Sequence, residues 1–204
     1  ANAGAEFVMI AHRKLTASAT AYANYRDTAA VNPVSVKLVY VDQIYDEYGF
    51  GTVTPCAIKR FCKDALDNWN VKPKYFLLWG KGKFQTRHDP DNSPLVPTYG
   101  YLATDYEFLG HFNQNSVEIK PEAAIGRVNI FNDAEGLAYL DKVNDYEHSV
   151  WDVWMKEGAF LGGGANEGEQ NAIGGAFRFF MNFFEGPPFG GKSIYFQKRT
   201  TDIT

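Results

Sequence analysis

The sequence predicts an α/β fold, a three-layer sandwich in which helices cover both faces of a mostly parallel sheet. The first observation is the unbroken apolar run 75–79, which ends at Gly80 and is typical of a strand buried on both faces. The second is a similar run at 7–11. The third is the alternation of strand and helix patterns between these runs, which favours parallel strands joined by right-handed crossovers.

The predicted strands differ in how completely they should be covered. Segment 75–79 is expected to be the central strand, whereas 34–41 alternates apolar and polar residues and should be less completely buried. The segments 106–109 and 123–128 are expected to form a small antiparallel hairpin around the polar turn at 113–116. A last strand is expected over 193–197.

The most clearly marked helix covers residues 54–70. Thr54 suits the N-cap and Pro55 the first turn, and apolar residues then recur at helical spacing. Three more helices are predicted, over residues 15–26, 132–151 and 170–184. The acidic, aromatic segment 42–51 and the proline-rich segment 81–104 are predicted to be loops.

The composition argues against two classes of partner. Charged residues make up 22% of the chain, the net charge is −4, and Lys and Arg form no cluster, so we expect no nucleic-acid partner. No stretch approaches the roughly 18 consecutive apolar residues of a membrane helix, so we expect no membrane span.

The central strand ends in Gly80-Lys81-Gly82-Lys83, at the edge of the sheet where α/β proteins bind ligands. A phosphate loop requires Gly-x-x-x-x-Gly-Lys-Ser/Thr, and a dinucleotide site requires Gly-x-Gly-x-x-Gly before a helix. Neither pattern is present, and a proline-rich segment follows instead. The sequence therefore indicates that this motif is not a nucleotide site.

A second glycine cluster, 162–164, precedes the helix expected at 170–184, and Glu167 and Glu169 lie at its entrance. These carboxylates would repel a phosphate. They suit either stabilisation of the helix N-terminus or a specificity site that receives a basic group of a substrate. Both interpretations stay open at this point.

Cysteine catalysis would require an activated thiol and a base. Cys56 falls two residues after the presumed N-cap, a position that lowers a thiol pKa, whereas Cys62 lies on the apolar face of its helix. The four histidines, His12, His88, His111 and His148, form no recognisable arrangement with either thiol in the sequence. We therefore interpret Cys56 as a structural or surface residue and Cys62 as a packing residue.

Oxygen ligands for Ca²⁺ are present in the proline-rich segment and just after it. Asp89, Asp91 and Asp105 are the metal-ligand candidates, but they do not follow the EF-hand pattern and also suit a surface turn. Ca²⁺ is accordingly the one cofactor candidate.

Ten short segments, taken in order, resemble the N-terminal part of gingipain-type cysteine peptidases, including sortase-like members of the bacterial type IX secretion pathway. The resemblance covers nearly the whole chain. The matching segments are 7–10, 54–61, 74–80, 96–99, 103–106, 124–128, 140–147, 154–156, 162–164 and 186–191.

The resemblance implies a caspase-like, and thus Rossmann-like, α/β fold in two subdomains. Residues 1–204 resemble the first subdomain, and we expect them to be a single α/β domain and a fragment of a longer chain. The family's catalytic His, followed by Gly, and its Cys come in that order in the second subdomain. Here both cysteines precede His88 and His111, and no His is followed by Gly. The dyad is therefore expected after Thr204, and the chain alone is predicted to be inactive.

Two departures from the family concern candidate site residues. Lys81 stands where many members carry Asp after the glycine of the central strand. Arginine-specific members carry an acidic residue at the start of the helix after the glycine-rich turn, and Glu167 or Glu169 is the nearest counterpart.

The family also implies partners and a location. We expect the remainder of the chain's own peptidase and a polypeptide substrate as partners, and a secreted or bacterial cell-surface protein. The alternative is a peptidase-like scaffold or binding domain of a surface secretion or gliding apparatus, without proteolytic activity.

Overall fold

The computed structural model describes residues 3–82, 95–99, 103–110 and 121–198. The chain divides into two compact units, Ala1–His148 and Ser149–Thr204, and each is described by itself. The prediction of a single domain over 1–204 is not tested by this division and stays a prediction.

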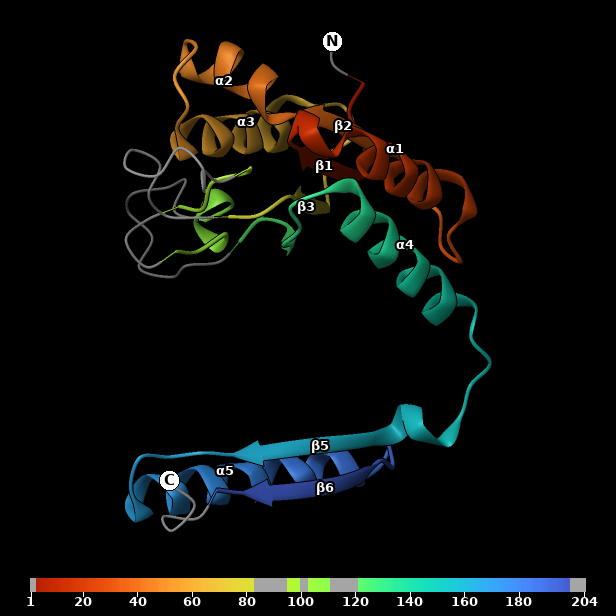
Figure 1. The fold of residues 1–204 in the computed structure, drawn as a ribbon, viewed down its shortest axis with the longest axis vertical. Helices are drawn as coiled ribbons and strands as arrows, with labels where there is room; N and C mark the ends of the chain where they lie inside the picture. The colour runs from red at the N-terminus through yellow and green to blue at the C-terminus, as the bar shows by residue number, and fades with distance from the viewer. Residues whose placement is uncertain (1–2, 83–94, 100–102, 111–120, 199–204) are drawn as a thin grey trace. The chain divides into compact units, whose positions relative to one another are not determined.

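The first unit contains a four-stranded parallel sheet in the order β2-β1-β3-β4 (Figure 1). β3 lies between β1 and β4, with Leu77 opposite Met9 and Gly126, so the central position predicted for 75–79 is confirmed. β2 is an edge strand that is half-buried throughout, as its alternation indicated. The strands are β1 (Phe7–Ala11), β2 (Val36–Tyr40), β3 (Tyr75–Trp79) and β4 (Ala124–Val128).

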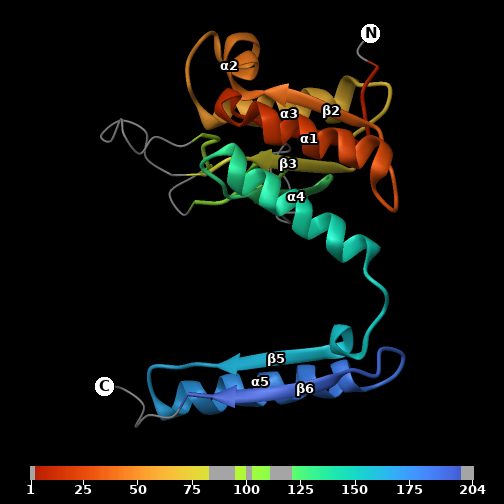
Figure 2. The same cartoon turned by 45° about the vertical axis from the view of Figure 1, so that its right-hand side comes forward.

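Helices cover both faces of this sheet, which confirms the predicted α/β class (Figures 1 and 2). Successive residues of a strand point to opposite faces. Accordingly Leu78 joins one apolar cluster with α2 and α3, and Trp79 joins another with α1 and α4. The helices are α1 (Thr16–Asn24), α2 (Val41–Gly49), α3 (Pro55–Asn68) and α4 (Asp133–His148). Single turns, η1 (Arg13–Leu15) and η2 (Tyr25–Ala29), flank α1.

Helix α3 forms as the sequence predicted. The Thr54 hydroxyl accepts a hydrogen bond from the Cys56 backbone N–H at 3.3 Å, and Pro55 occupies the first turn. The apolar face, including Ile58 and Phe61, is buried against the sheet and α2.

The prediction of a loop over 42–51 is wrong, because Val41–Gly49 forms helix α2. Val41, Ile44 and Tyr45 recur at helical spacing and are buried beside α3. The helix ends where Phe50 adopts a left-handed conformation with φ 53°, followed by Gly51. The apolar spacing outweighed the acidic and aromatic composition that suggested a loop.

The strand predicted at 106–109 is also wrong. Tyr106–Phe108 forms a short 3-10 turn, η4, in which Phe108 is fully buried. The hairpin predicted with 123–128 does not form, because that segment pairs in parallel with β3 as strand β4. In the described ranges, antiparallel pairing is limited to one isolated bridge between Tyr99 and Thr104.

A buried polar contact joins α1, α4 and β3. The Trp79 indole N–H donates to the Ser18 hydroxyl at 3.0 Å, and the Ser18 backbone N–H donates to the Asp133 carboxylate at 2.7 Å. Helices α1 and α4 approach closely here, since a Cβ on Gly136 would lie 2.5 Å from the Ser18 Cβ. A buried indole N–H needs such a partner, and this contact therefore fixes both helices on one face of the sheet.

The second unit is one β-α-β element. β5 and β6 pair in parallel, and α5 covers one face of the pair (Figure 1). Phe177 and Phe184 of α5 pack against Phe160, and Phe177 also packs against Tyr195. The elements are η5 (Val153–Lys156), β5 (Glu157–Gly162), α5 (Glu167–Glu185) and β6 (Lys192–Gln197). The helix and last strand predicted here are confirmed, although α5 begins at Glu167.

Membrane-spanning helices were also considered. Across the described ranges, no helix combines the length and the apolar character needed to cross a bilayer.

The C-terminal end of α4 is held to η2, the turn that follows α1, by a half-buried ionic cluster. Arg26 donates to one Glu147 carboxylate oxygen at 2.5 Å, and the Tyr25 hydroxyl donates to the other at 2.7 Å. Burial alone would raise the pKa of Glu147, but the hydrogen bonds from Tyr25 and Arg26 and the charge of Arg26 outweigh it and lower that pKa. Burial and the bond to Glu147 raise the pKa of Tyr25 to about 12.

We expect Glu147→Gln to lower the free energy of unfolding at neutral pH by about 1–2 kcal/mol, because a charged hydrogen-bond acceptor is lost. The pKa of Glu147 is lowered on folding, so its contribution is complete above the unfolded pKa and is lost as the pH falls through the folded value. Urea unfolding at pH 7 and near pH 3 should therefore show a difference between variant and parent that shrinks in acid. Asp145→Asn, an exposed neighbour on α4, is the control, and an equal loss in both variants would contradict the prediction.

Candidate functional site

Arg127 of β4 lies at the carboxyl ends of the central strands, the edge where α/β sheets bind ligands. Its guanidinium donates to both carboxylate oxygens of Asp105, at 2.8 and 2.7 Å. It also donates to the carbonyl oxygens of Gly80, Val96 and Pro97, at 2.8, 2.7 and 3.2 Å. The Arg127 side chain is only 10% exposed, so these contacts satisfy a buried cation.

The glycines after β3 make room for this arginine. Gly80 has φ 138°, which favours glycine, and a Cβ there would lie 3.0 Å from the Leu95 Cβ. A Cβ on Gly82 would lie 2.9 Å from the Arg127 Cζ. The Lys81 Nζ lies 4.0 Å from the centroid of the Phe131 ring. Residues 80–82 of this motif are thus explained by packing, and Lys83 lies outside the described residues.

The Ca²⁺ candidates are not brought together in the described residues. Both oxygens of Asp105 are engaged by Arg127, and Asp89 and Asp91 lie outside the described residues. Within the described ranges, His, Cys, Asp and Glu side chains form no group of three that could hold a metal ion. The Ca²⁺ hypothesis stays a prediction.

The two thiols lie in different environments. Cys62 is fully buried in the cluster between α3 and the sheet, and burial raises the pKa of its thiol. The interpretation of Cys62 as a packing residue is confirmed. Cys56 is exposed at the start of α3 and forms a hydrogen bond with the Tyr99 side chain.

Neither described histidine bonds to a cysteine. The His12 Nδ1 accepts from the Lys14 backbone N–H at 3.1 Å, and burial together with the charge of Lys14 lowers the pKa of His12. The His148 Nδ1 lies 2.9 Å from the Asn144 carbonyl oxygen. His88 and His111 lie outside the described residues.

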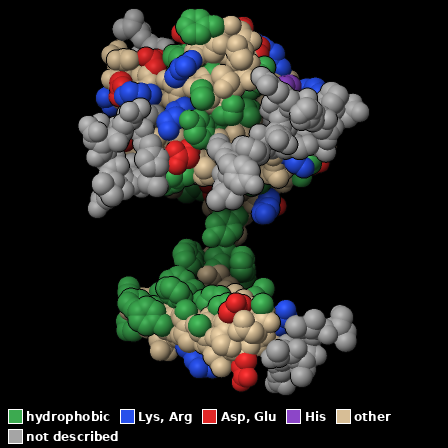
Figure 3. Space-filling view, turned by 90° about the vertical axis from the view of Figure 1, so that its left-hand side faces the viewer, with side chains coloured by type: hydrophobic (Ala, Val, Ile, Leu, Met, Phe, Trp, Pro, Cys, Tyr) green, Lys and Arg blue, Asp and Glu red, His purple; other side chains and the backbone are tan. Residues whose placement is uncertain are grey.

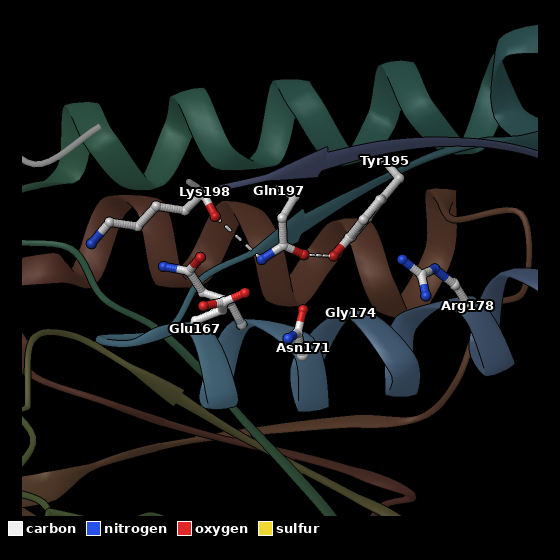
Figure 4. A pocket seen from close by; sticks show the side chains of 8 residues that line it. Glu167, Asn171, Gly174, Arg178, Tyr195, Gln197 and Lys198 are labelled. Carbon is white, nitrogen blue, oxygen red and sulfur yellow. Dashed lines mark hydrogen bonds between the residues drawn. The ribbon is translucent and has the colours of Figure 1, made fainter. Parts of the chain in front are cut away.

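The second unit contains a polar cavity of about 280 Å³ between α5 and β6 (Figure 4). Figure 4 shows Glu167 and Lys198 toward one end of this cavity and Arg178 at the other. The Tyr195 hydroxyl donates to the Gln197 Oε1 between them. The lining residues are Glu167, Gln170, Asn171, Gly174, Arg178, Tyr195, Gln197 and Lys198.

The structure gives the two candidate glutamates different surroundings. The Glu169 carboxylate accepts from the Ala165 backbone N–H at 2.8 Å, and the Asn166 side chain accepts from the Glu169 backbone N–H at 3.0 Å. Asn166 is the N-cap of α5, and the Glu169 carboxylate bonds to the backbone N–H of the residue before it, so the two contacts together stabilise the start of α5. Glu167 instead lines the cavity.

Sequence reasoning missed the other cavity residues, since Arg178 lies on α5 and Lys198 follows β6, and they line one cavity only because β6 pairs beside β5. One weak signal was a glycine inside an apolar helix. A Cβ on Gly174 would lie 2.9 Å from the Tyr195 Oη and 3.0 Å from the Gln197 Oε1, so glycine leaves space for this polar pair.

The chain was compared with protein-family models, curated proteins and solved structures. The model of peptidase family C25 matches residues 1–198. No curated protein matches the chain. Among solved structures, the dimeric latent PorU from Porphyromonas gingivalis is similar with a TM-score of 0.51 and 20% identity. The alignment covers 68% of this chain and 15% of PorU, so the chain spans a small part of that protein, and the likeness concerns the caspase-like fold.

We expect Arg127→Lys to lower the free energy of unfolding by about 3 kcal/mol, because an ammonium cannot replace the bidentate contact with Asp105 and would leave carbonyl oxygens unpaired. Urea denaturation measures the change. Arg178→Lys is the matched control, since Arg178 is exposed and forms no ion pair among the described residues. Similar stability losses in the two variants would refute the special role of Arg127.

Proposed function

Because the chain belongs to peptidase family C25, we propose that it is a non-catalytic N-terminal part of a gingipain-like cysteine endopeptidase. In such an enzyme a thiolate attacks the scissile carbonyl carbon while a histidine transfers the proton. We place both of these groups outside the present chain. Its own role is to support the catalytic half and to contribute to the specificity pocket.

The surroundings of the two thiols carry this proposal. A cysteine nucleophile needs access to substrate and a base within hydrogen-bond reach. Cys62 has no access because it is enclosed in the core. Cys56 is accessible, but its described side-chain partner is the phenol of Tyr99, whose pKa is raised by burial and by Cys56 itself. A phenol with a raised pKa is a poor base at neutral pH.

The open face of the second unit supports a further part of the peptidase as partner. Parallel sheets are normally covered on both faces, and two strands alone are marginally stable. Helix α5 covers one face of the β5–β6 pair, whereas Leu161, Ile194 and Phe196 on the other face are exposed. We propose that the remainder of the peptidase chain covers this face.

The cavity beside α5 supports a role in substrate selection. We propose that Glu167 receives a basic side chain of a polypeptide substrate, while Glu169 keeps the helix start in place. Lys198 and Arg178 also line the cavity, so a basic group would have to bind close to Glu167. This arrangement favours a single basic side chain over a strongly cationic peptide.

We further propose that the protein is secreted or located at the bacterial cell surface, as the family resemblance implies.

A scaffold without proteolytic activity is the second candidate for the function, and the exposed apolar face of the β5–β6 pair favours it equally. The complete protein separates the two candidates: hydrolysis of peptides that an irreversible thiol reagent abolishes supports the peptidase, and its absence supports the scaffold.

We expect the 204-residue chain alone to hydrolyse no peptide, because neither of its described thiols is paired with a base. Casein and a panel of fluorogenic peptides should give the same background rate with the parent chain and with Cys56→Ala. Cleavage that disappears in Cys56→Ala would overturn the placement of the catalytic groups outside this chain.

In the complete enzyme, we expect Glu167→Gln to lower kcat/KM for substrates with a basic side chain by about tenfold or more, with little change for neutral ones. Glu169→Gln is the matched control. It should lower the melting temperature through the lost cap and leave the ratio of kcat/KM values unchanged. If Glu169→Gln alters that ratio and Glu167→Gln does not, the assignment is wrong.

A further inference from the structure

The cavity beside α5 follows the helix over several turns. Lining residues at spacings of three and four positions lie in a row along α5 (Figure 4): Glu167, Asn171, Gly174 and Arg178. An α-helix rises about 1.5 Å per residue, so Glu167 and Arg178 are separated by about 16 Å along the helix axis. The cavity is therefore long enough for a stretch of extended polypeptide rather than for one side chain alone.

The charges that line this cavity do not balance. Glu167 is acidic, whereas Arg178 and Lys198 are basic. A ligand that brings only a basic group to Glu167 would leave both cations without a counter-charge. Opposite charges attract more strongly in a partly enclosed site than in bulk water. The cavity as a whole therefore suits a ligand that carries an acidic group as well as a basic one.

Arg178 is the residue best placed to receive the acidic group. Figure 4 shows it at the opposite end of the cavity from Glu167. It is exposed and forms no ion pair among the described residues. A guanidinium can bind a carboxylate through two parallel hydrogen bonds. The positions three and four residues away on α5 offer it no acidic partner, since they are Gly174, Gly175, Met181 and Asn182.

We propose that Arg178 receives an acidic side chain of the same polypeptide substrate whose basic side chain binds Glu167. An extended chain rises about 3.3 Å per residue and directs every second side chain to the same side. Side chains four positions apart therefore lie about 13 Å apart on one side, and the long Arg178 side chain can cover the remaining distance. The recognised segment thus has a basic and an acidic residue four positions apart. This inference rests on the proposed role of Glu167.

The middle of the cavity suits the backbone of such a segment. Asn171, Tyr195 and Gln197 line it with amide and hydroxyl groups that carry no charge. These groups both donate and accept hydrogen bonds, as the peptide backbone requires. Figure 4 shows Tyr195 and Gln197 across the cavity from α5. The two charged ends would therefore select the side chains, while the middle tolerates any sequence.

The test is the binding of fluorescent peptides to the complete protein, measured by fluorescence anisotropy after an irreversible thiol reagent has stopped cleavage. Each peptide carries one arginine, with glutamate or glutamine four positions before or after it. We expect glutamate on one of these sides to lower Kd about three- to fivefold relative to glutamine. Arg178→Gln should abolish this difference, and Arg178→Glu should instead favour lysine at that position.

Lys192→Gln is the matched control, because Lys192 is an exposed cation of the same unit that does not line the cavity. It should keep the preference of the parent protein, and circular dichroism should show that every variant is folded. A parent protein that binds the glutamate and glutamine peptides equally, or binds neither, would overturn the inference. So would a folded Arg178→Gln variant that keeps the preference for glutamate.

The same peptides separate this inference from the proposed function. Glu167→Gln should lose the preference for arginine over glutamine at the basic position but keep the preference for glutamate at the acidic one. If Glu167→Gln keeps the preference for arginine, the proposed role of Glu167 is wrong, whatever Arg178 does. Absence of hydrolysis by the untreated protein would count against the peptidase proposal alone, because the anisotropy measurement needs no cleavage.

Discussion

The contact between Arg127 and Asp105 is the constraint on which the first unit depends. One buried guanidinium joins the end of β3, the segment at 95–99 and the turn at 105–108, and all of its described contacts are to oxygen atoms. A buried cation is tolerated only when such partners are present. The constraint also explains two glycines, because a side chain at 80 or 82 would collide with the neighbours that this contact holds in place.

The same constraint changes how the carboxyl edge of the sheet is understood. That edge is where α/β proteins bind ligands, yet here its buried Arg127 guanidinium is satisfied by Asp105 and by three backbone carbonyl oxygens. The substrate site that we propose lies in the second unit, where the cavity beside α5 carries charged side chains without ion pairs among the described residues. Glu167 and Glu169 are two residues apart, but one lines the cavity and the other caps the helix.

The second unit is also the reason why we propose a further part of the peptidase as partner. A single β-α-β element cannot cover its own sheet, and its helix carries phenylalanine on the face that the sheet does not use. The two exposed surfaces differ in kind. One is the uncovered face of the β5–β6 pair, and the other is the outer face of α5, where Phe179, Phe180 and Phe183 are exposed.

The sequence by itself determined the elements whose signals are local. Five apolar residues before Gly80 made a buried strand, and Thr54 with Pro55 started a helix, because burial pattern and capping act over a few residues.

Tertiary structure decided the elements that depend on partners far away in the chain. Segment 106–109 became a turn rather than a strand where Arg127 holds Asp105, and 123–128 paired with β3 instead of forming a hairpin. Helix α2 formed because α3 offered an apolar surface for its spacing. The cavity of α5 and β6 exists only because two strands meet 35 residues apart in the chain, at Glu157 and Lys192, and no local pattern encodes that meeting.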